Sequence, residues 1–458
     1  MESISIWILN MRSKEKRLMN LRLSDKDLVA MENILKQILK GRGFFNGIAS
    51  YCTANTLVIE ALLQNAKNTQ KPVLIEATAN QVNQYGGYTG MTPQEFADFV
   101  YHIADQMGCN RSLIILGGDH LGPLTFKSHP EEEAMEKAKV LVREYVKAGF
   151  TKIHLDTSMK LASDAKEEPL STKTIAKRGA VLYQACMDAF SQMRGKVIQK
   201  PVFVIGSEVP IPGGATEEEE GISVTKITDF VDTVETYKEV FKEHRISQAW
   251  ENIIAVVVQP GVEFGDSQVF YYNREEAKGL CHSLKDYPTL VFEGHSTDYQ
   301  TKEKLKEMVE DGIAILKVGP ALTFRLREAL FSLSLMEKEL ISKEKQACFI
   351  EVLEEVMLAE PENWINHYHG NEEEIALARK YSYSDRCRYY LTNPRVQEAI
   401  QILLRNIDHV GIPLNLLHQY MPNQYEKVVR GQLKNHAKQL VYDAVLEVVS
   451  TYEYAVRN

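Results

Sequence analysis

The segment Leu113-Ile114-Ile115-Leu116-Gly117-Gly118-Asp119-His120 joins a short apolar run to a polar, glycine-rich end. Runs of this kind recur along residues 44–318, and their alternation with helix-like stretches decides the fold. Short runs rich in β-branched residues are typical of buried parallel strands. The expected strands are Phe44–Tyr51, Val73–Ala77, Leu113–Leu116, Ile153–Leu155, Val202–Ile205, Ile253–Val258, Leu290–Phe292 and Ile313–Val318.

Amphipathic stretches fill the gaps between these runs, and Thr92-Pro93 is a helix start signal. The expected helices are Pro93–Met107, Glu131–Ala148, Ser171–Arg194, Lys226–His244, Arg274–Leu284 and Lys302–Glu310. Strands that alternate with helices in this number predict an α/β fold, a (β/α)8 TIM barrel. The alternative is a doubly wound open sheet, which usually carries a G-x-G-x-x-G turn after its first strand. No such turn follows residue 51.

The strand pattern stops after residue 330, and residues 331–458 have a wholly helical pattern interrupted by prolines. We therefore expect a barrel over residues 28–330 and an all-helical C-terminal extension over residues 331–458. Residues 1–27 combine a short apolar run with a basic one, and we expect them to form a loose extension.

The bulk composition excludes several classes of protein. The net charge of -9 argues against nucleic acid as a partner. The six cysteines are scattered without a C-x-x-C pair, which fits a reducing cytoplasm. No segment approaches the ~18 apolar residues of a membrane span. The chain has no G-x-x-x-x-G-K-[ST] loop, and we expect no nucleotide cofactor.

Polar residues gather at the predicted strand ends, where barrels place their catalytic groups. Burying so many carboxylates and histidines is costly without a cation, a ligand or mutual pairing. This predicts a divalent metal such as Zn²⁺, Mn²⁺ or Mg²⁺, and a salt-bridged network without metal is the alternative. The expected metal ligands are His120, Glu208 and His295, with Glu293 and Gln259 as further candidates. Asp119, Asp156 or Glu293 would then transfer protons.

A phosphate site is expected at the loops after the last two strands, as in many barrels. Glycines there allow close backbone approach, and hydroxyl and guanidinium groups add donors. The residues are Gly294, Ser296, Thr297, Gly319 and Arg325, with Arg327 nearby. Ordinary turn glycines with a helix cap are the alternative.

Several long motifs resemble those of the Z-type subunit of class II tagatose-1,6-bisphosphate aldolase. The resemblance covers about residues 28–455. Its motifs include Ile75–Thr78, Asn80–Gln84, Gly86–Pro93, Leu116–Pro123, Ile153–Met159, Gly206–Gly214, Val258–Phe264, Glu293–Gln300, Lys317–Phe324, Glu354–Leu358 and Tyr381–Arg386.

This resemblance implies a TIM barrel that acts in galactitol or N-acetylgalactosamine breakdown, at the level of tagatose phosphates. It implies an accessory, non-catalytic role, in which the chain supports the activity and stability of a separate zinc-dependent catalytic subunit. Some relatives resemble sugar-phosphate C4 epimerases with a metal of their own.

The resemblance also bears on the metal ligands. Catalytic class II aldolases carry an Asp-His pair after strand three, which Asp119 and His120 match, and a glutamate that Glu208 matches. Where those enzymes have their second and third zinc histidines, this chain has Gln259 and Glu293. The standard three-histidine zinc site is therefore not expected.

Two functions remain open from the sequence. The first is an accessory subunit of tagatose-bisphosphate aldolase, with the class II catalytic subunit as partner. The second is a metal-dependent epimerase that interconverts fructose 6-phosphate and tagatose 6-phosphate in its own active site. Both place a sugar phosphate at the barrel mouth.

Overall fold

The computed structural model of the 458-residue chain describes residues 28–39, 46–193, 196–207 and 222–456. The loose extension predicted for residues 1–27 and the predicted metal ligand Glu208 lie outside these described residues.

Eight parallel strands form a closed barrel. Each strand pairs with the next one along the chain, and β12 pairs back with β2 to close the cylinder. This confirms the (β/α)8 prediction and excludes the open doubly wound sheet. The strands are β2 (Ile48–Cys52), β3 (Val73–Thr78), β4 (Ile114–Leu121), β5 (Lys152–Leu155), β7 (Val202–Ile205), β8 (Ile253–Val258), β11 (Val291–Gly294) and β12 (Ile313–Val318).

One predicted strand end is wrong. The prediction stopped at Leu116, before the glycines, but β4 continues to Leu121. A Cβ atom on Gly117 would lie 2.5 Å from Oε1 of Glu76 on the neighbouring strand. The glycine therefore makes room for a buried carboxylate inside the barrel and does not mark a turn.

A helix follows each barrel strand and packs on the outside of the cylinder. Pro93–Met107 and Lys302–Glu310 are helices over the predicted residues, and a capping box between Thr92 and Glu95 begins the first of them. The helices are α3 (Thr56–Thr69), α4 (Pro93–Met107), α5 (Glu131–Lys147), α6 (Thr172–Gln192), α7 (Ile227–Glu243), α8 (Arg274–Ser283), α9 (Lys302–Glu310) and α10 (Pro320–Leu340).

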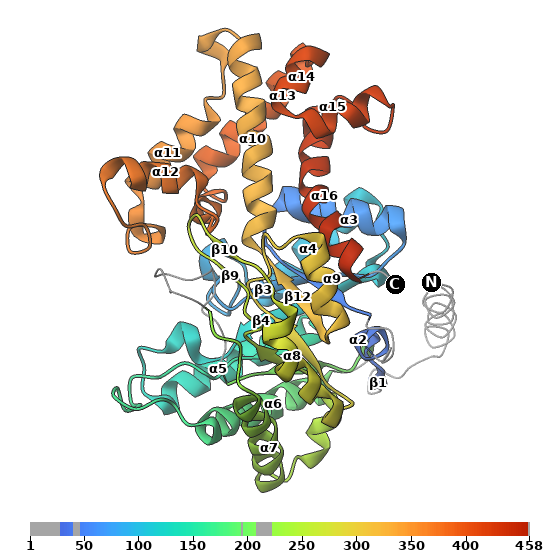
Figure 1. Ribbon diagram of the computed structural model, residues 1–458, viewed down its shortest axis with the longest axis vertical. Helices are drawn as coiled ribbons and strands as arrows, with labels where there is room; N and C mark the ends of the chain where they lie inside the picture. Colours follow the sequence, from blue (N-terminus) through green and yellow to red (C-terminus); the bar gives the residue numbers. More distant parts are fainter. Residues whose placement is uncertain (1–27, 40–45, 194–195, 208–221, 457–458) are drawn as a thin grey trace.

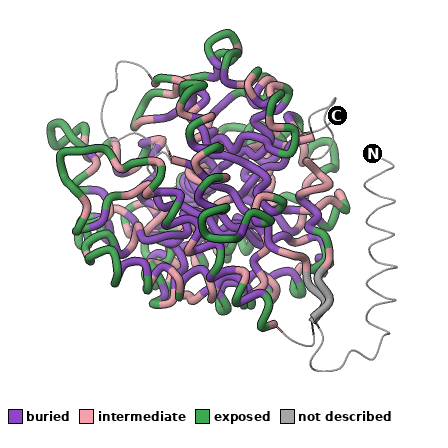
Figure 2. The backbone as a smooth tube through the Cα atoms, turned by 90° about the horizontal axis from the view of Figure 1, so that it is seen from below, coloured by how far each residue is buried: buried purple, intermediate pink, exposed green. Residues whose placement is uncertain are grey.

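The short helix α2 (Ile34–Ile38) closes the floor of the barrel. Its Ile34 and Leu35 are buried in one cluster with inward-facing strand residues such as Leu74, Ile115 and Ile315. Asn33 caps this helix and also donates to the carbonyl of Thr151 at 2.8 Å. Figure 2, seen from below, shows the buried residues concentrated at the centre of the molecule. The barrel is therefore apolar at its floor, which leaves the opposite end for polar chemistry.

Two small sheets accompany the barrel. Strand β1 (Leu28–Met31) pairs in parallel with β6 (Lys196–Gln199). Strands β9 (Glu263–Phe264) and β10 (Val269–Phe270) form an antiparallel hairpin in the loop after β8.

The chain after the barrel is helical, as predicted, over the residues described up to 456. Helix α10 runs without interruption across residue 330, so the last barrel helix is also the first helix of the extension (Figure 1). The final helix returns to the barrel and packs against α3, α9 and α10. The remaining helices are α11 (Phe349–Ala359), α12 (Glu372–Tyr381), α13 (Pro394–Val410), α14 (Leu414–Tyr420), α15 (Pro422–Val429) and α16 (Ala437–Val456).

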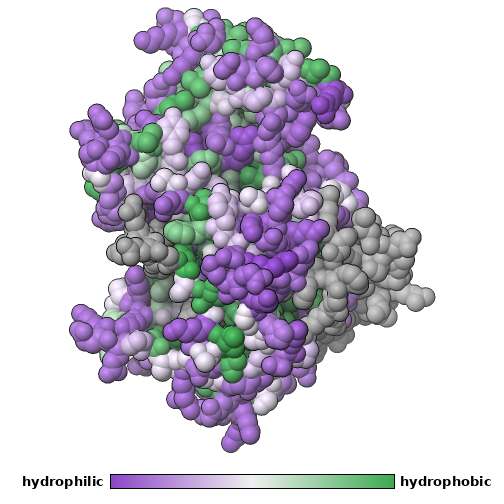
Figure 3. Space-filling view, viewed as in Figure 1, coloured by the Kyte–Doolittle hydropathy of each residue, from purple (hydrophilic) through white to green (hydrophobic). Residues whose placement is uncertain are grey.

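The surface is mostly polar. On the face shown in Figure 3, hydrophobic residues form small, separated groups among hydrophilic ones. None of the helices in the described part of the chain has the length and apolar character to cross a membrane.

We predict that the contact of α16 with the barrel is needed for stability. Leu440 is fully buried on this helix. Leu440→Ala should lower the free energy of unfolding by about 2–5 kcal/mol, because the lost methyl groups leave a cavity. Chemical denaturation of the whole chain measures this. Ser450→Ala, at an exposed position of the same helix, is the control, and an equal effect of both variants would contradict the packing.

Candidate functional site

The polar mouth of the barrel follows from the two-residue period of its strands. Side chains two residues apart on a strand face the same side. Each apolar residue of the barrel floor is therefore followed, two positions later, by an inward-facing residue nearer the mouth. On three strands this second residue is charged, and the pairs are Leu74 and Glu76, Val291 and Glu293, and Ile315 and Lys317.

The deeper layer of the mouth is a chain of buried ion pairs. Nζ of Lys152 lies 2.8 Å from Oε1 of Glu76 and 2.7 Å from Oε2 of Glu293, and all three side chains are fully buried. Lys317 pairs with the other oxygen of Glu76, and its Nζ lies 2.9 Å from Oδ2 of Asp119. Such groups are tolerated inside a protein because each charge faces an opposite one.

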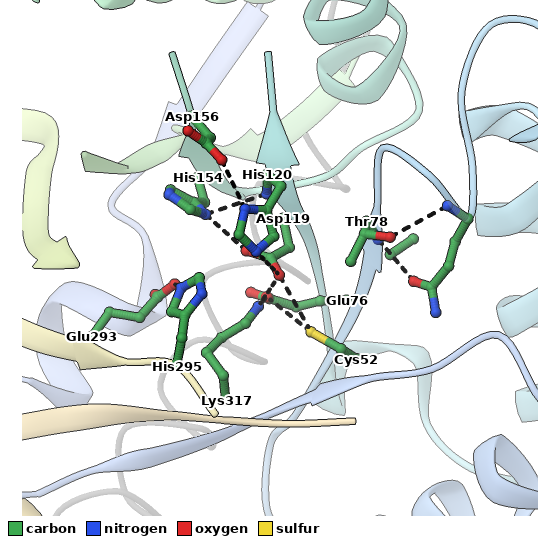
Figure 4. A network of polar contacts seen from close by, with 12 residues as sticks. Cys52, Glu76, Thr78, Asp119, His120, His154, Asp156, Glu293, His295 and Lys317 are labelled. Atoms are coloured by element: carbon green, nitrogen blue, oxygen red, sulfur yellow. Dashed lines mark hydrogen bonds and ion pairs between the residues drawn. The ribbon is translucent and has the colours of Figure 1, made fainter. Parts of the chain in front are cut away.

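The upper layer contains three histidines, each held by a carboxylate (Figure 4). His120 Nδ1 lies 2.8 Å from Asp156 Oδ2, and His295 Nε2 lies 3.1 Å from Glu293 Oε1. His154 Nδ1 lies 2.8 Å from Asp119 Oδ1. The centroids of the three rings are 5.0–5.3 Å apart. The sequence analysis expected two of these histidines as metal ligands and did not select His154.

His154 differs from its neighbours because one of its ring nitrogens is free. Nδ1 of His154 lies 2.8 Å from Asp119 Oδ1 and 3.2 Å from the backbone nitrogen of His120. In the tautomer that carries its proton on Nδ1, the ring donates to Asp119 and Nε2 is left as an acceptor. This buried Nε2 has no hydrogen-bond partner among the described residues. Ligand atoms of Asp119, His120, His154 and His295 all lie within 4.8 Å of one another. A free acceptor beside two further imidazoles and a carboxylate is a donor set that suits a divalent cation.

Electrostatics keep the carboxylates of the mouth ionised. Burial alone raises the pKa values of Asp119, Asp156 and Glu293, but neighbouring histidines and lysines outweigh it, and all three pKa values are lowered. Burial likewise opposes a charge on His120, yet Asp119 and Asp156 raise its pKa. Burial lowers the pKa of His295 to about 4, so this ring is neutral at pH 7. These three ionised carboxylates thus lie beside two lysines and one readily protonated histidine.

The backbone at the mouth is locally strained. His120 has a φ of 48° and Ser296 a φ of 51°, in the left-handed region that residues other than glycine rarely occupy. Residues held in such conformations cluster at binding and catalytic sites. His120 directly follows Asp119 on β4, and Ser296 directly follows His295, one residue beyond the end of β11.

A cavity of about 100 Å³ opens above these groups. This is smaller than the ~300–1,000 Å³ pockets that hold drug-sized ligands, which favours a compact ligand. Barrel residues such as Asp119, His120, His295 and Lys317 line one part of it. Arg388 and Tyr389 from the C-terminal extension, and Tyr88 from the loop after β3, line another part.

The structure brings most of the predicted catalytic and metal-binding residues together. Asp119, His120, Asp156, Glu293 and His295 form one connected network. Gln259 does not join it, because its side-chain oxygen accepts hydrogen bonds from the backbone of Gly261 and Val262, at 2.9 and 3.0 Å.

The predicted phosphate-binding residues are more dispersed. Ser296 and Gly319 line the cavity. Thr297 donates to the carbonyl of Lys317 at 2.6 Å, and Gly294 allows β11 to pack against Ile313. Arg325 points to the extension, where its Nη2 lies 2.8 Å from Glu447.

A carboxylate occupies the backbone donors that were predicted to bind phosphate. Oδ1 of Asp298 accepts from the backbone N–H groups of Gly319 and Ala321, at 3.0 and 2.8 Å. Burial raises the pKa of Asp298 to about 6. These N–H groups already have an acidic partner within the chain.

Five residues of the site were not selected from the sequence: Glu76, Lys152, His154, Lys317 and Arg388. Glu76 and Lys317 lie two residues after Leu74 and Ile315, and this spacing was the available signal. His154 lies inside a predicted strand but two residues after Lys152, so no apolar spacing marks it. Lys152 lies one residue before the predicted strand Ile153–Leu155, and lysines are mostly exposed in proteins. Arg388 had no signal, since its place at the barrel mouth depends on the docking of the extension.

The chain is similar to known proteins over most of its length. The family model described as D-tagatose-1,6-bisphosphate aldolase subunit GatZ/KbaZ-like matches residues 31–457. The D-tagatose-1,6-bisphosphate aldolase subunits GatZ of Escherichia coli K12 and of Escherichia coli O1:K1 are each 45% identical over 408 residues, which is 89% of this chain and 96% of the relative.

A solved structure is also similar over most of the chain. It is the crystal structure of a probable tagatose 6-phosphate kinase from Sinorhizobium meliloti 1021, with 44% identity and a TM-score of 0.82. The match covers 90% of this chain and all of that one.

We predict that Lys152 is the residue on which the mouth depends most. Lys152→Met should destabilise the chain by about 3–5 kcal/mol, because Glu76 and Glu293 would lose their shared cation in a buried place. Thermal and chemical unfolding measure the loss. Lys147→Met removes an exposed lysine and should change stability by no more than about 0.5 kcal/mol. A Lys152→Met protein as stable as this control would contradict the assignment.

Proposed function

The chain belongs to the GatZ/KbaZ-like family of D-tagatose-1,6-bisphosphate aldolase subunits, and from this we propose that it serves as a subunit of such an aldolase. The observation that carries the proposal is its 45% identity to GatZ subunits over 96% of their length. The class II catalytic subunit is its partner, and a tagatose phosphate is the ligand of the complex.

In this proposal the chain is an accessory subunit, which does not itself catalyse aldol cleavage. The sequence resemblance to catalytic class II aldolases implies that Gln259 and Glu293 stand where those enzymes have two of their zinc histidines. Gln259 is engaged with the backbone of its own loop, and Glu293 is neutralised by Lys152. Aldol cleavage is therefore assigned to the partner. This chain contributes stability and activity through contact with it.

We also propose that the mouth holds a divalent metal ion. His120, His154 and His295 would bind it, with Asp119 beside them. The unpartnered Nε2 of His154 and the excess of buried carboxylates over lysines support this fit. Bound there, a divalent cation would supply Lewis acidity toward a carbonyl oxygen. Asp119 and Asp156 orient two imidazoles through contacts of 2.8 Å with the Nδ1 atoms of His154 and His120.

A second candidate function is the ketohexose-phosphate C4 epimerase. The specific observation in its favour is that the cavity keeps an acid, histidines and a lysine together, namely Asp119, His120, His295 and Lys317. A purely structural partner does not need this costly arrangement. Under this proposal the ionised Asp119 would take up and return a proton.

Co-expression tests the accessory role. We expect this chain to raise the aldolase activity and the thermal half-life of a class II tagatose-bisphosphate aldolase catalytic subunit several-fold. A His120→Ala variant should give the same support, since the support comes from contact between the chains. An unrelated barrel of similar size is the control. Equal activity and half-life with and without this chain would refute the accessory role.

The His120→Ala variant also tests the proposed epimerase activity. Purified alone, the chain should interconvert fructose 6-phosphate and tagatose 6-phosphate, and His120→Ala should abolish this turnover. A chain that shows no turnover with added Zn²⁺, Mn²⁺ or Mg²⁺ leaves the accessory role as its function.

Metal analysis tests the binding site directly. After dialysis against a buffer that contains a trace of divalent metal, the purified chain should retain about one divalent ion per molecule. His154→Ala should lower this below a tenth of an ion, because the free imidazole acceptor is lost. His102→Ala, at an exposed position on α4, is the matched control. Mass spectrometry of the metal content and visible absorption of a Co²⁺ form give readouts that do not depend on activity. A wild-type chain that retains no metal would refute the proposed metal site.

A further inference from the structure

Arg388 lies in the wall of the mouth cavity but does not belong to the barrel. It is part of the short helix η8 (Arg386–Tyr390), in the middle of the C-terminal extension. The extension thus supplies a cation to a cavity whose remaining charged residues come from barrel strands and loops. We ask what this guanidinium can bind.

Arg388 has neutral partners. Its Nη2 donates to the hydroxyl of Tyr389 at 2.9 Å, and its Nη1 donates to the carbonyls of Asp385, at 3.1 Å, and Ser384. Within the described residues it forms no ion pair, whereas Arg325 and Arg327 on α10 each pair with a carboxylate. The charge of Arg388 is therefore left for a ligand.

The segment that carries Arg388 is fixed to the barrel. Asp385 accepts from the hydroxyl of Thr323 at 2.6 Å, and Arg327 lies at 3.4 Å from its other oxygen. On the opposite side, the backbone N–H of Tyr383 donates to the carbonyl of Asp266 at 2.9 Å. These contacts to α10 and to the β9–β10 hairpin hold the guanidinium in place before any ligand arrives.

The glycine-rich motif Gly86-Gly87-Tyr88-Thr89-Gly90 builds the neighbouring wall. Gly87 has a φ of 56°, and a Cβ there would lie 2.3 Å from the carbonyl oxygen of Gln81, so no other residue fits. The tight turn places the ring of Tyr88 edge-on to Tyr389, with centroids 4.9 Å apart. Burial raises the pKa of Tyr88 to about 12, which keeps its hydroxyl protonated as a donor.

The other cation of the cavity is already neutralised. Lys317 is held between Glu76 and Asp119. The backbone donors at the start of α10 are held by Asp298. Among the described residues that line the cavity, Arg388 is thus the cation that forms no close ion pair, although Asp298 and Asp385 interact with its charge at longer range.

We propose that Arg388, flanked by Tyr88 and Tyr389, binds the phosphate group of a sugar phosphate, whose hydroxylated part faces Asp119 and the histidines. A guanidinium matches phosphate oxygens with two parallel N–H donors. In this proposal Arg388 takes the place of the backbone N–H groups of Gly319 and Ala321, which donate to Asp298. It rests on the proposed function for the nature of the ligand, and it assigns the recognition of the phosphate to the C-terminal extension.

Calorimetric titration of the purified full chain tests this subsite. Tagatose 6-phosphate and fructose 6-phosphate should bind at least tenfold more tightly than the unphosphorylated sugars. Inorganic phosphate should compete with the sugar phosphates. Arg388→Met should weaken the sugar phosphates tenfold or more and leave the binding of the free sugars unchanged. Arg388→Lys, which keeps the charge but loses the paired N–H donors, should fall between them.

Arg395→Met, an exposed arginine of the same extension, is the matched control and should bind like the wild type. Equal affinity for phosphorylated and free sugars would overturn the proposal, as would unchanged binding by Arg388→Met. If Arg388→Met does not fold, a crystal structure of the wild type with phosphate decides. Phosphate in contact with Arg388 supports the subsite, and phosphate bound elsewhere or absent overturns it.

These measurements use the isolated chain, so they are independent of the co-expression experiment. A chain that binds sugar phosphates through Arg388 but does not support the aldolase would refute the accessory role alone. A chain that supports the aldolase but does not bind phosphate at Arg388 would refute this subsite alone.

Discussion

The ammonium group of Lys152, held between Glu76 and Glu293, is the interaction on which the barrel mouth depends. Each of these glutamates also holds a second side chain. Glu293 holds the ring of His295, and Glu76 holds Lys317, which in turn pairs with Asp119. One buried cation on β5 thereby fixes side chains on β3, β4, β11 and β12. The energetic cost of burying these charges is offset only while the whole set remains paired.

The barrel strands and the C-terminal extension contribute different parts of the cavity wall. The strands provide a rigid, charged platform, while the C-terminal extension approaches it from above through η8. Because the extension is anchored on α10 and on the β9–β10 hairpin, the two halves of the cavity wall keep a fixed relation. A relative could alter what enters the mouth by changing residues near Arg388 without disturbing the ion pairs inside the barrel.

The sequence predicted the architecture well, because the fold rests on local periodicity. Each expected strand corresponds to a barrel strand, and the helix limits at Pro93–Met107 and Lys302–Glu310 agree with the structure. The predicted strand ended before Gly117 and Gly118, since only their neighbours in the fold explain them: Glu76 lies against Gly117, and Leu121 and Tyr145 lie against Gly118. A glycine that accommodates a carboxylate and a glycine that bends the chain look alike in a single sequence.

The site was predicted less completely for a similar reason. Asp119, His120 and His295 stand out because they follow apolar runs. Lys152 owes its role to partners far away along the chain, and Arg388 owes its role to the docking of the extension on the barrel. No spacing reveals either. The reassignment of the backbone donors to Asp298 likewise depends on the folding of one loop toward another. Periodicity identifies the strand on which a residue lies, but not the group it meets inside the barrel.

The return of α16 to the barrel has a consequence for biosynthesis. Glu60 on α3 meets the hydroxyl of Tyr442 at 2.6 Å and Nζ of Lys438 at 2.8 Å, across 382 and 378 positions of sequence. At about 5–20 residues per second, a ribosome needs roughly 20 to 75 seconds to make the intervening chain. During that interval the first barrel helix has been synthesised while the helix that covers it has not. The nascent protein therefore exposes the face of α3 that α16 covers in the finished chain.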